Sequence, residues 1–283
     1  MTQILIQGLL LSGLYALIAV GFTLIFSVGR VLNLAYGAYL MLGGYAYFWS
    51  VQQMGMAKLP GFIFAVIIGA LSGLLMYRFL VRRLAGDHGA VEIATLILAV
   101  VVQSGVVLIF NDSAKVLHPI VSGVWRFGNV SITFNILAAM VANWMILGAL
   151  YYFVKRTHLG RAMQAVSMDR KGAAICGIDV NQVNQLTWAI SGMLGAVAGV
   201  FFASYTQLNP TMWVAPLIIA VAVVIVGGIG SIIGTLVVAH VIGFMETVTT
   251  TLIAAELRGV FTMALIIAVL VIRPKGLFGR EEL

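Results

Sequence analysis

Charged residues are scarce in this sequence. Only 9% of its 283 residues are Asp, Glu, Lys or Arg, whereas a water-soluble domain carries roughly a quarter. Apolar residues make up 62%, and the mean hydropathy is +1.09. A chain of this size with so few charges lacks the polar groups to cover its surface in water. The sequence therefore predicts a protein whose main solvent is lipid.

Cysteines, nucleotide-binding motifs and catalytic motifs are also missing. Cys176 is the only cysteine, which excludes an intrachain disulfide and a cysteine-rich metal site. No G-x-x-x-x-G-K-[ST] loop occurs, so any ATP that drives this protein must bind to another chain. The four histidines are widely separated, and neither an H-E-x-x-H pattern nor a nucleophile elbow is present. We therefore expect no catalytic residue, no metal and no cofactor bound by this chain.

What the sequence does contain is continuous apolar runs of about twenty residues, the length of a transmembrane helix. A membrane β-barrel would instead show short stretches of alternating polarity. The 31 glycines are typical of helices that pack closely in a bilayer. Hydropathy predicts spans over 4–28, 34–51, 60–81, 92–110, 134–154, 186–206, 214–227, 231–252 and 259–272. The predicted fold is an all-α polytopic helical bundle of about eight to nine spans, forming a single transmembrane domain over 1–283. A re-entrant hairpin over 214–250 is an alternative to two of these crossings.

The basic residues predict the orientation of the chain. Most of the 16 lysines and arginines fall on one side of this arrangement: Arg30, Arg78, Arg82, Arg83, Lys155, Arg156, Arg161, Arg170, Lys171, Arg273, Lys275 and Arg280. Since cytoplasmic loops carry the excess of positive charge, this side should be cytoplasmic. We therefore expect a multi-pass protein of a bacterial inner membrane, with the N-terminus outside and the C-terminus inside.

The cytoplasmic segment 155–185 is the most polar part of the chain. Small and apolar residues recur at helical spacing over 162–166 and 173–178, and Gly160 and Gly177 bracket that stretch. A short amphipathic helix held between two spans can dock into a groove on a partner. Such a helix would transmit force from a cytoplasmic motor to a membrane protein that has none. The alternative is a cationic connecting loop that lies on the inner leaflet.

This segment resembles the coupling segment of permeases in the branched-chain amino-acid ABC transporter family, with its Gly-Arg-Ala start, acidic residue, small residues and Gly-Ile pair. The corresponding residues are Gly160, Arg161, Ala162, Asp169, Ala173, Ala174, Gly177 and Ile178. The runs 15–23, 33–37, 194–200 and 227–234 and the tail 273–280 are similar to further family segments. The resemblance thus covers nearly the whole chain. Tyr36 stands where the family usually has His, and Arg30 lies near a usually small position, which leaves the exact substrate open.

The resemblance implies a membrane-spanning importer subunit for branched-chain amino acids or similar small amphipathic solutes. It implies four partners: a second, related permease, two cytoplasmic ATPases that bind ATP and Mg, and a periplasmic solute-binding protein. Related ABC permeases for urea, short amides, or aromatic or small carboxylic acids remain alternatives. An ion-coupled secondary transporter is a third class, but it would need charged or carbonyl-rich ion sites at mid-membrane, and few acids are found there.

Polar residues within or near the spans are candidates for the pathway, because polar groups are costly in lipid, and glycines are candidates where their backbone could line a cavity. The candidates are Asn33, Tyr36, Gln103, Gly227, Gly228, Gly230 and Glu246. Asn33 and Gln103 have an alternative role as hydrogen-bond partners of neighbouring helices. The glycines would permit either a tight turn with close helix contact or a broken helix that lines a cavity. Glu246 suits a subunit contact as well as a substrate ammonium group. Near the outer surface, Glu256 and Arg258 are expected to form an ion pair, either with each other or with a docking partner.

Overall fold

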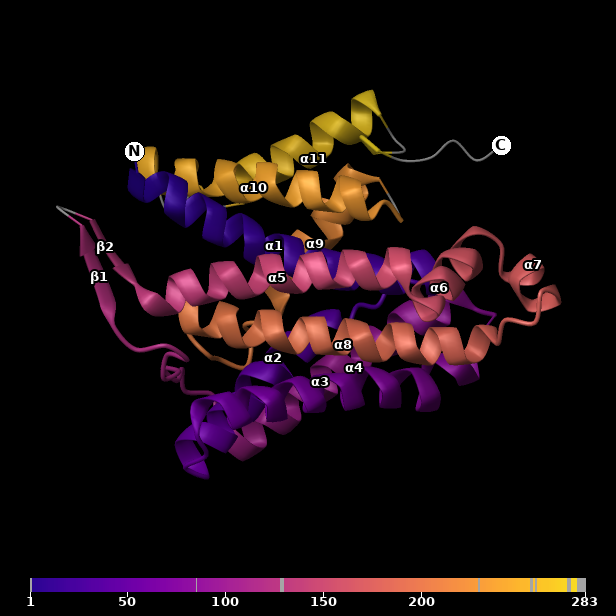
Figure 1. The fold of residues 1–283 in the computed structure, drawn as a ribbon, viewed down its shortest axis with the longest axis horizontal. Coiled ribbons are helices and arrows are strands. Elements are labelled where there is room, and N and C mark those ends of the chain that lie inside the picture. The colour runs from indigo at the N-terminus through magenta and orange to yellow at the C-terminus, as the bar shows by residue number, and fades with distance from the viewer. Residues whose placement is uncertain are drawn as a thin grey trace. The chain divides into compact units, whose positions relative to one another are not determined.

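The apolar runs form helices whose bounds follow the hydropathy closely. The computed structural model describes residues 2–84, 86–127, 130–228, 230–254, 257, 259–273 and 276–278. Glu256, Arg258, Lys275 and Arg280 lie outside these residues, and so does the expected ion pair. The helices are α1 (Thr2–Gly29), α2 (Tyr36–Phe48), α3 (Lys58–Phe79), α4 (His88–Phe110), α5 (Phe134–Arg156), α6 (His158–Met168), α7 (Arg170–Ile175), α8 (Val180–Tyr205), α9 (Val214–Gly227), α10 (Ile232–Leu252) and α11 (Val260–Ile272) (Figure 1).

Six of the described helices are long and apolar enough to cross a membrane. They are α1, α3, α4, α5, α8 and α10. The shorter helices α2, α9 and α11 complete the set of expected apolar segments. A π-helical turn (Trp49–Gln53) extends α2, and a 3-10 turn (Val81–Leu84) follows α3. The expected all-α polytopic fold is confirmed, because the remaining regular structure is one small hairpin within the part of the chain that is described.

That hairpin was not expected from the sequence. Strands β1 (Val124–Phe127) and β2 (Val130–Thr133) pair antiparallel, with Val124 opposite Thr133. The loop before it is fixed by Asn135, whose side-chain oxygen accepts a hydrogen bond from the Ile120 amide at 2.9 Å. Four-residue strands carry too few alternations to be recognised in a hydrophilic segment.

The chain divides into two compact units, each made of segments far apart in the sequence. Unit 1 comprises Met1–Thr23, Pro119–Met145 and Ile218–Leu283, and unit 2 comprises Leu24–His118 and Ile146–Leu217. The expectation of a single transmembrane domain stays a prediction.

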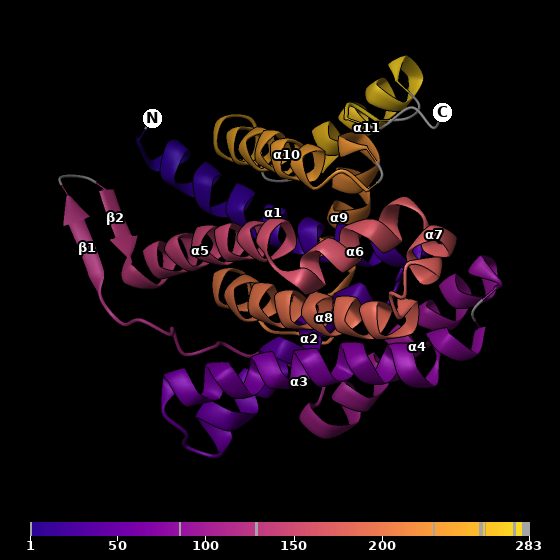
Figure 2. The same cartoon turned by 45° about the vertical axis from the view of Figure 1, so that its right-hand side comes forward.

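Unit 2 is built on glycines that bring α2, α3 and α8 into close contact. Helices α3 and α8 run side by side (Figures 1 and 2), and a Cβ on Gly69 would fall on the Gly192 carbonyl. A Cβ on Gly199 would likewise fall on the backbone of Leu40 in α2. Because small residues let helix backbones approach in lipid, these positions hold the core of the unit. The opposite side of α3 exposes the stripe Ile63, Ile67 and Leu71.

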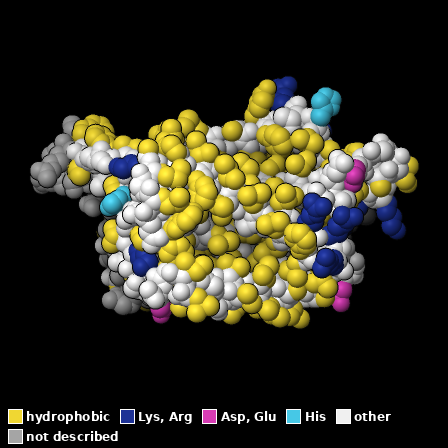
Figure 3. Space-filling model, turned by 90° about the horizontal axis from the view of Figure 1, so that it is seen from below, with side chains coloured by type: hydrophobic (Ala, Val, Ile, Leu, Met, Phe, Trp, Pro, Cys, Tyr) yellow, Lys and Arg dark blue, Asp and Glu magenta, His cyan; other side chains and the backbone are white. Residues whose placement is uncertain are grey.

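Exposed apolar side chains cover much of the molecular face drawn in Figure 3. Among the exposed apolar residues of the chain, Ile93 and Ile97 of α4 are 64% and 58% exposed. The basic side chains on this face gather mainly toward one end (Figure 3). An apolar band with basic residues at one end is the surface expected of helices that lie in a bilayer.

In unit 1, α1 and α10 cross at a similarly close contact. A Cβ on Gly243 of α10 would lie 2.5 Å from the Ser12 Cα of α1, and Gly8 of α1 faces the ring of Phe244. Helices α9 and α10 are joined by a glycine turn at residues 228–231.

Candidate functional site

The polar segment between α5 and α8 is a pair of helices with a corner between them. Helix α6 ends at Met168 and α7 begins at Arg170, and Asp169 lies between the two. Thr157, Asp169 and Asp179 precede α6, α7 and α8, and each side-chain oxygen accepts hydrogen bonds of 2.9–3.1 Å from backbone N–H groups in the following turn. These are N-caps, which satisfy the free donors at a helix start. The segment therefore consists of capped helices rather than an irregular loop.

Four of the predicted coupling residues form the turn that ends α7. Gly177 has a φ of +84°, a conformation that glycine adopts without a steric penalty. The amide of Gly177 donates to the Ala174 carbonyl, and the amide of Ile178 donates to the Ala173 carbonyl, both at 3.0 Å. This pair of bonds is a Schellman motif. The chain direction between α7 and α8 is thereby fixed.

The buried face of the segment packs on the rest of unit 2. Gly160, Met163, Val166 and Ala173 are buried. Gly160 allows the closest approach, because a Cβ there would fall on the Phe153 carbonyl at the end of α5. Gly160 thus fixes the packing of α6 on α5, and its role in coupling stays a prediction.

Several apolar side chains of the segment are exposed. Leu159, Met168 and Ile175 are 47%, 69% and 87% exposed. Arg161 is also exposed, with its guanidinium 3.3 Å from Nδ1 of His158, and Ala162 is half-buried. These exposed apolar side chains make the segment a candidate docking site for a partner.

The segment differs in two respects from the expected helix bracketed by Gly160 and Gly177. Gly160 lies inside the first turn of α6, and the helical stretch is broken at Asp169. The break arises because Asp169 has extended backbone angles, with φ −146° and ψ 110°, and its carboxylate caps the next helix. Gly177 does end the stretch, as expected.

Asn33 and Tyr36 belong to a buried polar cluster in unit 2. The Asn33 side chain accepts a hydrogen bond from the Ala35 amide at 3.1 Å and donates to the Tyr39 hydroxyl at 3.4 Å. That hydroxyl lies 3.0 Å from the Met76 sulfur of α3, and the Tyr36 and Tyr39 rings pack edge to face. The cluster therefore ties the start of α2 to α3.

Gln103 is also bonded within unit 2. Its side-chain oxygen accepts a hydrogen bond of 2.6 Å from the indole nitrogen of Trp213. This contact fits the alternative role of a partner for a neighbouring segment. Trp213 is only 6% exposed, because it packs against Gly37 of α2.

The glycine-rich segment of unit 1 combines a turn with close packing. Gly228 and Gly230 have positive φ values of 96° and 84°, and a Cβ on Gly227 would lie 2.8 Å from the Gly234 carbonyl oxygen. The described tail residue Leu277 donates its amide to the Val226 carbonyl at 2.8 Å. Turn and contact account for these glycines, and their role in the pathway stays a prediction.

Glu246 is buried in α10 at 5% exposure, and it accepts a hydrogen bond of 2.6 Å from the Tyr15 hydroxyl of α1. Both residues belong to unit 1. The sequence identified Glu246 but not Tyr15 as its partner, because 231 residues separate them and no periodicity links them.

The pathway candidates are thus divided between the two units: Asn33, Tyr36 and Gln103 lie in unit 2, and Gly227, Gly228, Gly230 and Glu246 lie in unit 1. Tyr39, Tyr15 and Trp213 are contact residues that sequence reasoning missed. Within the described residues, no three or more His, Cys, Asp or Glu side chains could together hold a metal ion.

Comparison with known proteins places this arrangement in context. A family model described as "Branched-chain amino acid transport system / permease component" matches residues 4–270. The chain is similar to the high-affinity branched-chain amino acid transport system permease protein BraD of Pseudomonas aeruginosa, at 29% identity over 99% of this chain and 96% of the relative. It is 28% identical to the corresponding LivH protein of Escherichia coli K12, with the same coverage.

More distant similarity extends to a ribose import permease protein, RbsC of Haemophilus influenzae. The identity is 26%, over 91% of this chain and 80% of the relative. No solved structure matches the chain.

Proposed function

This chain belongs to the family of branched-chain amino acid transport system permease components, and we propose that it forms half of the translocation pore of an importer for branched-chain amino acids. It is a membrane permease of an ABC transport system, and its apolar helices make it a multi-pass membrane protein. The proposal goes further and assigns the partners, the direction of the chain in the membrane and the route by which ATP drives transport.

One observation carries the proposal: the capped α6–α7 segment presents apolar side chains to its surroundings. Met168 and Ile175 are exposed on either side of the Asp169 corner, where a groove of a partner can receive them. We assign this surface to two cytoplasmic ATPases that bind ATP and Mg and hydrolyse ATP. A second, related permease completes the pore, and a periplasmic solute-binding protein delivers the solute.

In this mechanism ATP binding closes the ATPase pair and displaces the α6–α7 segment. Because caps and a Schellman turn fix both ends of the segment, it moves as a rigid piece and changes the side to which the pathway opens. Asn33, Tyr36, Gln103 and Glu246 remain candidates for the pathway lining. They hold one another or neighbouring helices, so weak contact with a passing solute is expected rather than a tight intramembrane site.

The orientation follows from this assignment. The segment must face the cytoplasm, which places the N-terminus outside and the C-terminus inside the bacterial inner membrane. The basic residues Lys155, Arg156 and Lys171 of this segment agree with that direction.

The substrate assignment rests on relatives named as branched-chain amino acid permeases, which match nearly the whole chain. A ribose import permease is also similar, so ribose is the alternative solute that the uptake assay should include. Urea, short amides and aromatic or small carboxylic acids should be tested as alternative solutes in the same assay. In the assembled importer, labelled leucine uptake should be reduced by excess isoleucine or valine and unaffected by excess ribose.

The coupling role is tested with Ile175→Asp in the complete importer reconstituted in liposomes. An unpaired carboxylate at the centre of the contact should lower ATP-driven leucine uptake about tenfold, the effect of losing one strong contact residue. Ile175→Met keeps an apolar side chain and should retain uptake. Normal uptake by Ile175→Asp would refute the coupling surface, and uptake that follows an ion gradient without ATP would refute the ABC mechanism.

A further inference from the structure

The corner of the α6–α7 segment lies against the end of α1 within unit 2. The guanidinium of Arg30, the residue after α1, donates to the carbonyl oxygens of Ser167 and Met168 at 3.5 and 3.4 Å. These carbonyls belong to the last turn of α6. A cation there meets the negative end of the helix dipole and satisfies carbonyls that have no partner inside the helix.

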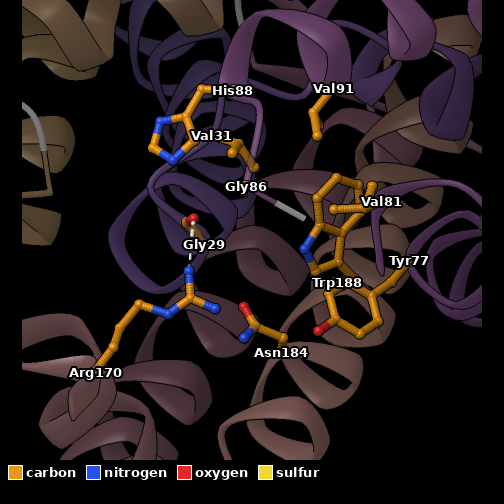
Figure 4. A pocket seen from close by; sticks show the side chains of 10 residues that line it. All are labelled: Gly29, Val31, Tyr77, Val81, Gly86, His88, Val91, Arg170, Asn184 and Trp188. Atoms are coloured by element: carbon orange, nitrogen blue, oxygen red, sulfur yellow. Dashed lines mark hydrogen bonds between the residues drawn. The ribbon is translucent and has the colours of Figure 1, made fainter. Parts of the chain in front are cut away.

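Arg170 makes the reciprocal contact from the other side of the corner. Its guanidinium donates to the carbonyl oxygen of Gly29, the last residue of α1, at 3.4 Å (Figure 4). Each of the two helices is thus capped at its C-terminal end by an arginine from the other segment. Asp169, the corner itself, lies between the two contacts along the chain.

The backbone of Arg30 supplies an independent indication that its side chain matters. Its φ is +54°, in the left-handed region where a helix-ending residue is usually glycine. Arginine is sterically unfavourable in this conformation. A glycine would end α1 without this steric cost. We therefore infer that Arg30 stands at this position for the contacts of its guanidinium.

The chain beyond Arg30 leads directly to the buried polar cluster of α2. Asn33, three residues on, is 1% exposed and bonds Ala35 and Tyr39. Residues 31–35 form no helix, so a displacement of Gly29 and Arg30 passes along this short connection to Asn33.

We propose that Arg30 and Arg170 are positioning residues that transmit the movement of the α6–α7 segment to the α1–α2 junction. This inference rests on the proposed function, because it presumes that an ATPase moves the segment. The two arginines act as one link. The end of α6 is bonded to Arg30, and Arg170 is bonded to the end of α1, so a displacement of the segment displaces the end of α1. Neither arginine touches the solute.

The link also has room to change. Arg170 borders a cavity of about 60 Å³ that Trp188, Asn184 and Val31 also line (Figure 4). Close-packed interiors resist small displacements. Beside this cavity the guanidinium can shift without displacing a packed side chain, so the contacts can break and re-form during a transport cycle.

The test uses the complete importer in liposomes and measures ATP hydrolysed per leucine taken up. Arg30→Gln and Arg170→Gln should each raise this ratio by about fivefold, the lower range of coupling between protein sites. The double variant should equal the single variants, because residues that act as a unit are not additive. Arg170→Lys keeps the charge and should recover part of the coupling. Arg83→Gln is the matched control and should leave the ratio unchanged, because Arg83 is exposed and its one hydrogen bond to the described residues is from its backbone amide to Leu80.

Arg30→Gly separates this role from a structural one. Glycine relieves the left-handed backbone, so assembly and thermal stability should be kept or improved while the ATP-to-leucine ratio still rises. Hydrogen exchange gives a second measurement: ATP should change the protection of amides 30–35 in the parent and not in Arg30→Gly.

Two results would overturn the link. One is a parental ratio in Arg30→Gly and Arg170→Gln while Ile175→Asp lowers uptake as expected, which would leave the proposed coupling surface intact. The other is an unaltered ATP-dependent exchange of amides 30–35 in Arg30→Gly. If Ile175→Asp also transports normally, the proposed function itself fails.

Discussion

At the scale of single residues, the hydrogen bond between Tyr15 and Glu246 is the polar contact on which unit 1 depends most clearly. It joins α1 to α10 at 2.6 Å, and the carboxyl group is almost fully buried. A buried carboxyl group that loses a donor keeps its desolvation penalty. Removing the Tyr15 hydroxyl should therefore destabilise the protein, whether or not the pair contacts a solute.

Tyr15→Phe should therefore lower the free energy of unfolding by about 2 kcal/mol, within the range for removing one partner of a buried hydrogen bond. Thermal unfolding of the purified protein in detergent measures this change. Tyr45→Phe is the matched control, because the buried Tyr45 hydroxyl has no hydrogen-bond partner within the described residues. Equal losses in the two variants would contradict a special role for the Tyr15 hydroxyl.

The residue scale is also where sequence reasoning reached its limit. Glu246, Asn33 and Gln103 could be identified because polar groups in apolar runs are conspicuous. Their partners Tyr15, Tyr39 and Trp213 could not be identified, since tyrosine and tryptophan are ordinary residues in a membrane helix. Only the packing of helices brings the members of each pair together.

At the scale of helices, glycine positions decide which faces meet. Gly69 of α3 lies against α8, where an added Cβ would overlap both the Gly192 carbonyl and the Ala196 side chain. Gly105 of α4 has no atom within 4 Å of such a Cβ. Alanine substitutions at Gly69 and Gly105 therefore distinguish the effect of a helix–helix contact from the effect of helix propensity.

Gly69→Ala should lower the free energy of unfolding by about 2 kcal/mol, as expected for overpacking of a close contact. Gly105→Ala should show no loss, because alanine is the better helix former and meets open space. Thermal unfolding of both variants in the same detergent is the measurement. A stable Gly69→Ala protein would show that α3 and α8 are not packed as closely as described.

Helix positions themselves were largely predictable. The expected span 214–227 coincides with α9, and 231–252 differs from α10 by one residue, because long apolar runs leave few alternatives in lipid. The corner at Asp169 was not predictable, since it depends on a single side-chain cap within a stretch of helical spacing. Helix α4 likewise begins at His88 rather than at 92, because Asp87 caps it through the Ala90 amide.

At the scale of the whole molecule, the chain is a multi-pass permease of its family. The proposed function supplies its energy from partner ATPases. In the proposed mechanism, the exposed apolar side chains of α6 and α7 and the Arg30–Arg170 link carry movement from an ATPase to the buried cluster at Asn33. The account therefore depends on the side of the membrane on which this segment lies.

The sole cysteine, Cys176, is exposed at the end of α7, so the native sequence carries the probe for that question. The measurement is the labelling of Cys176 by a membrane-impermeant maleimide in sealed vesicles of both orientations, with and without bound ATPases. The account predicts labelling only when the cytoplasmic face is outward, and loss of that labelling once the ATPases are bound. Labelling from the periplasmic face, or full labelling in the presence of bound ATPases, would contradict it.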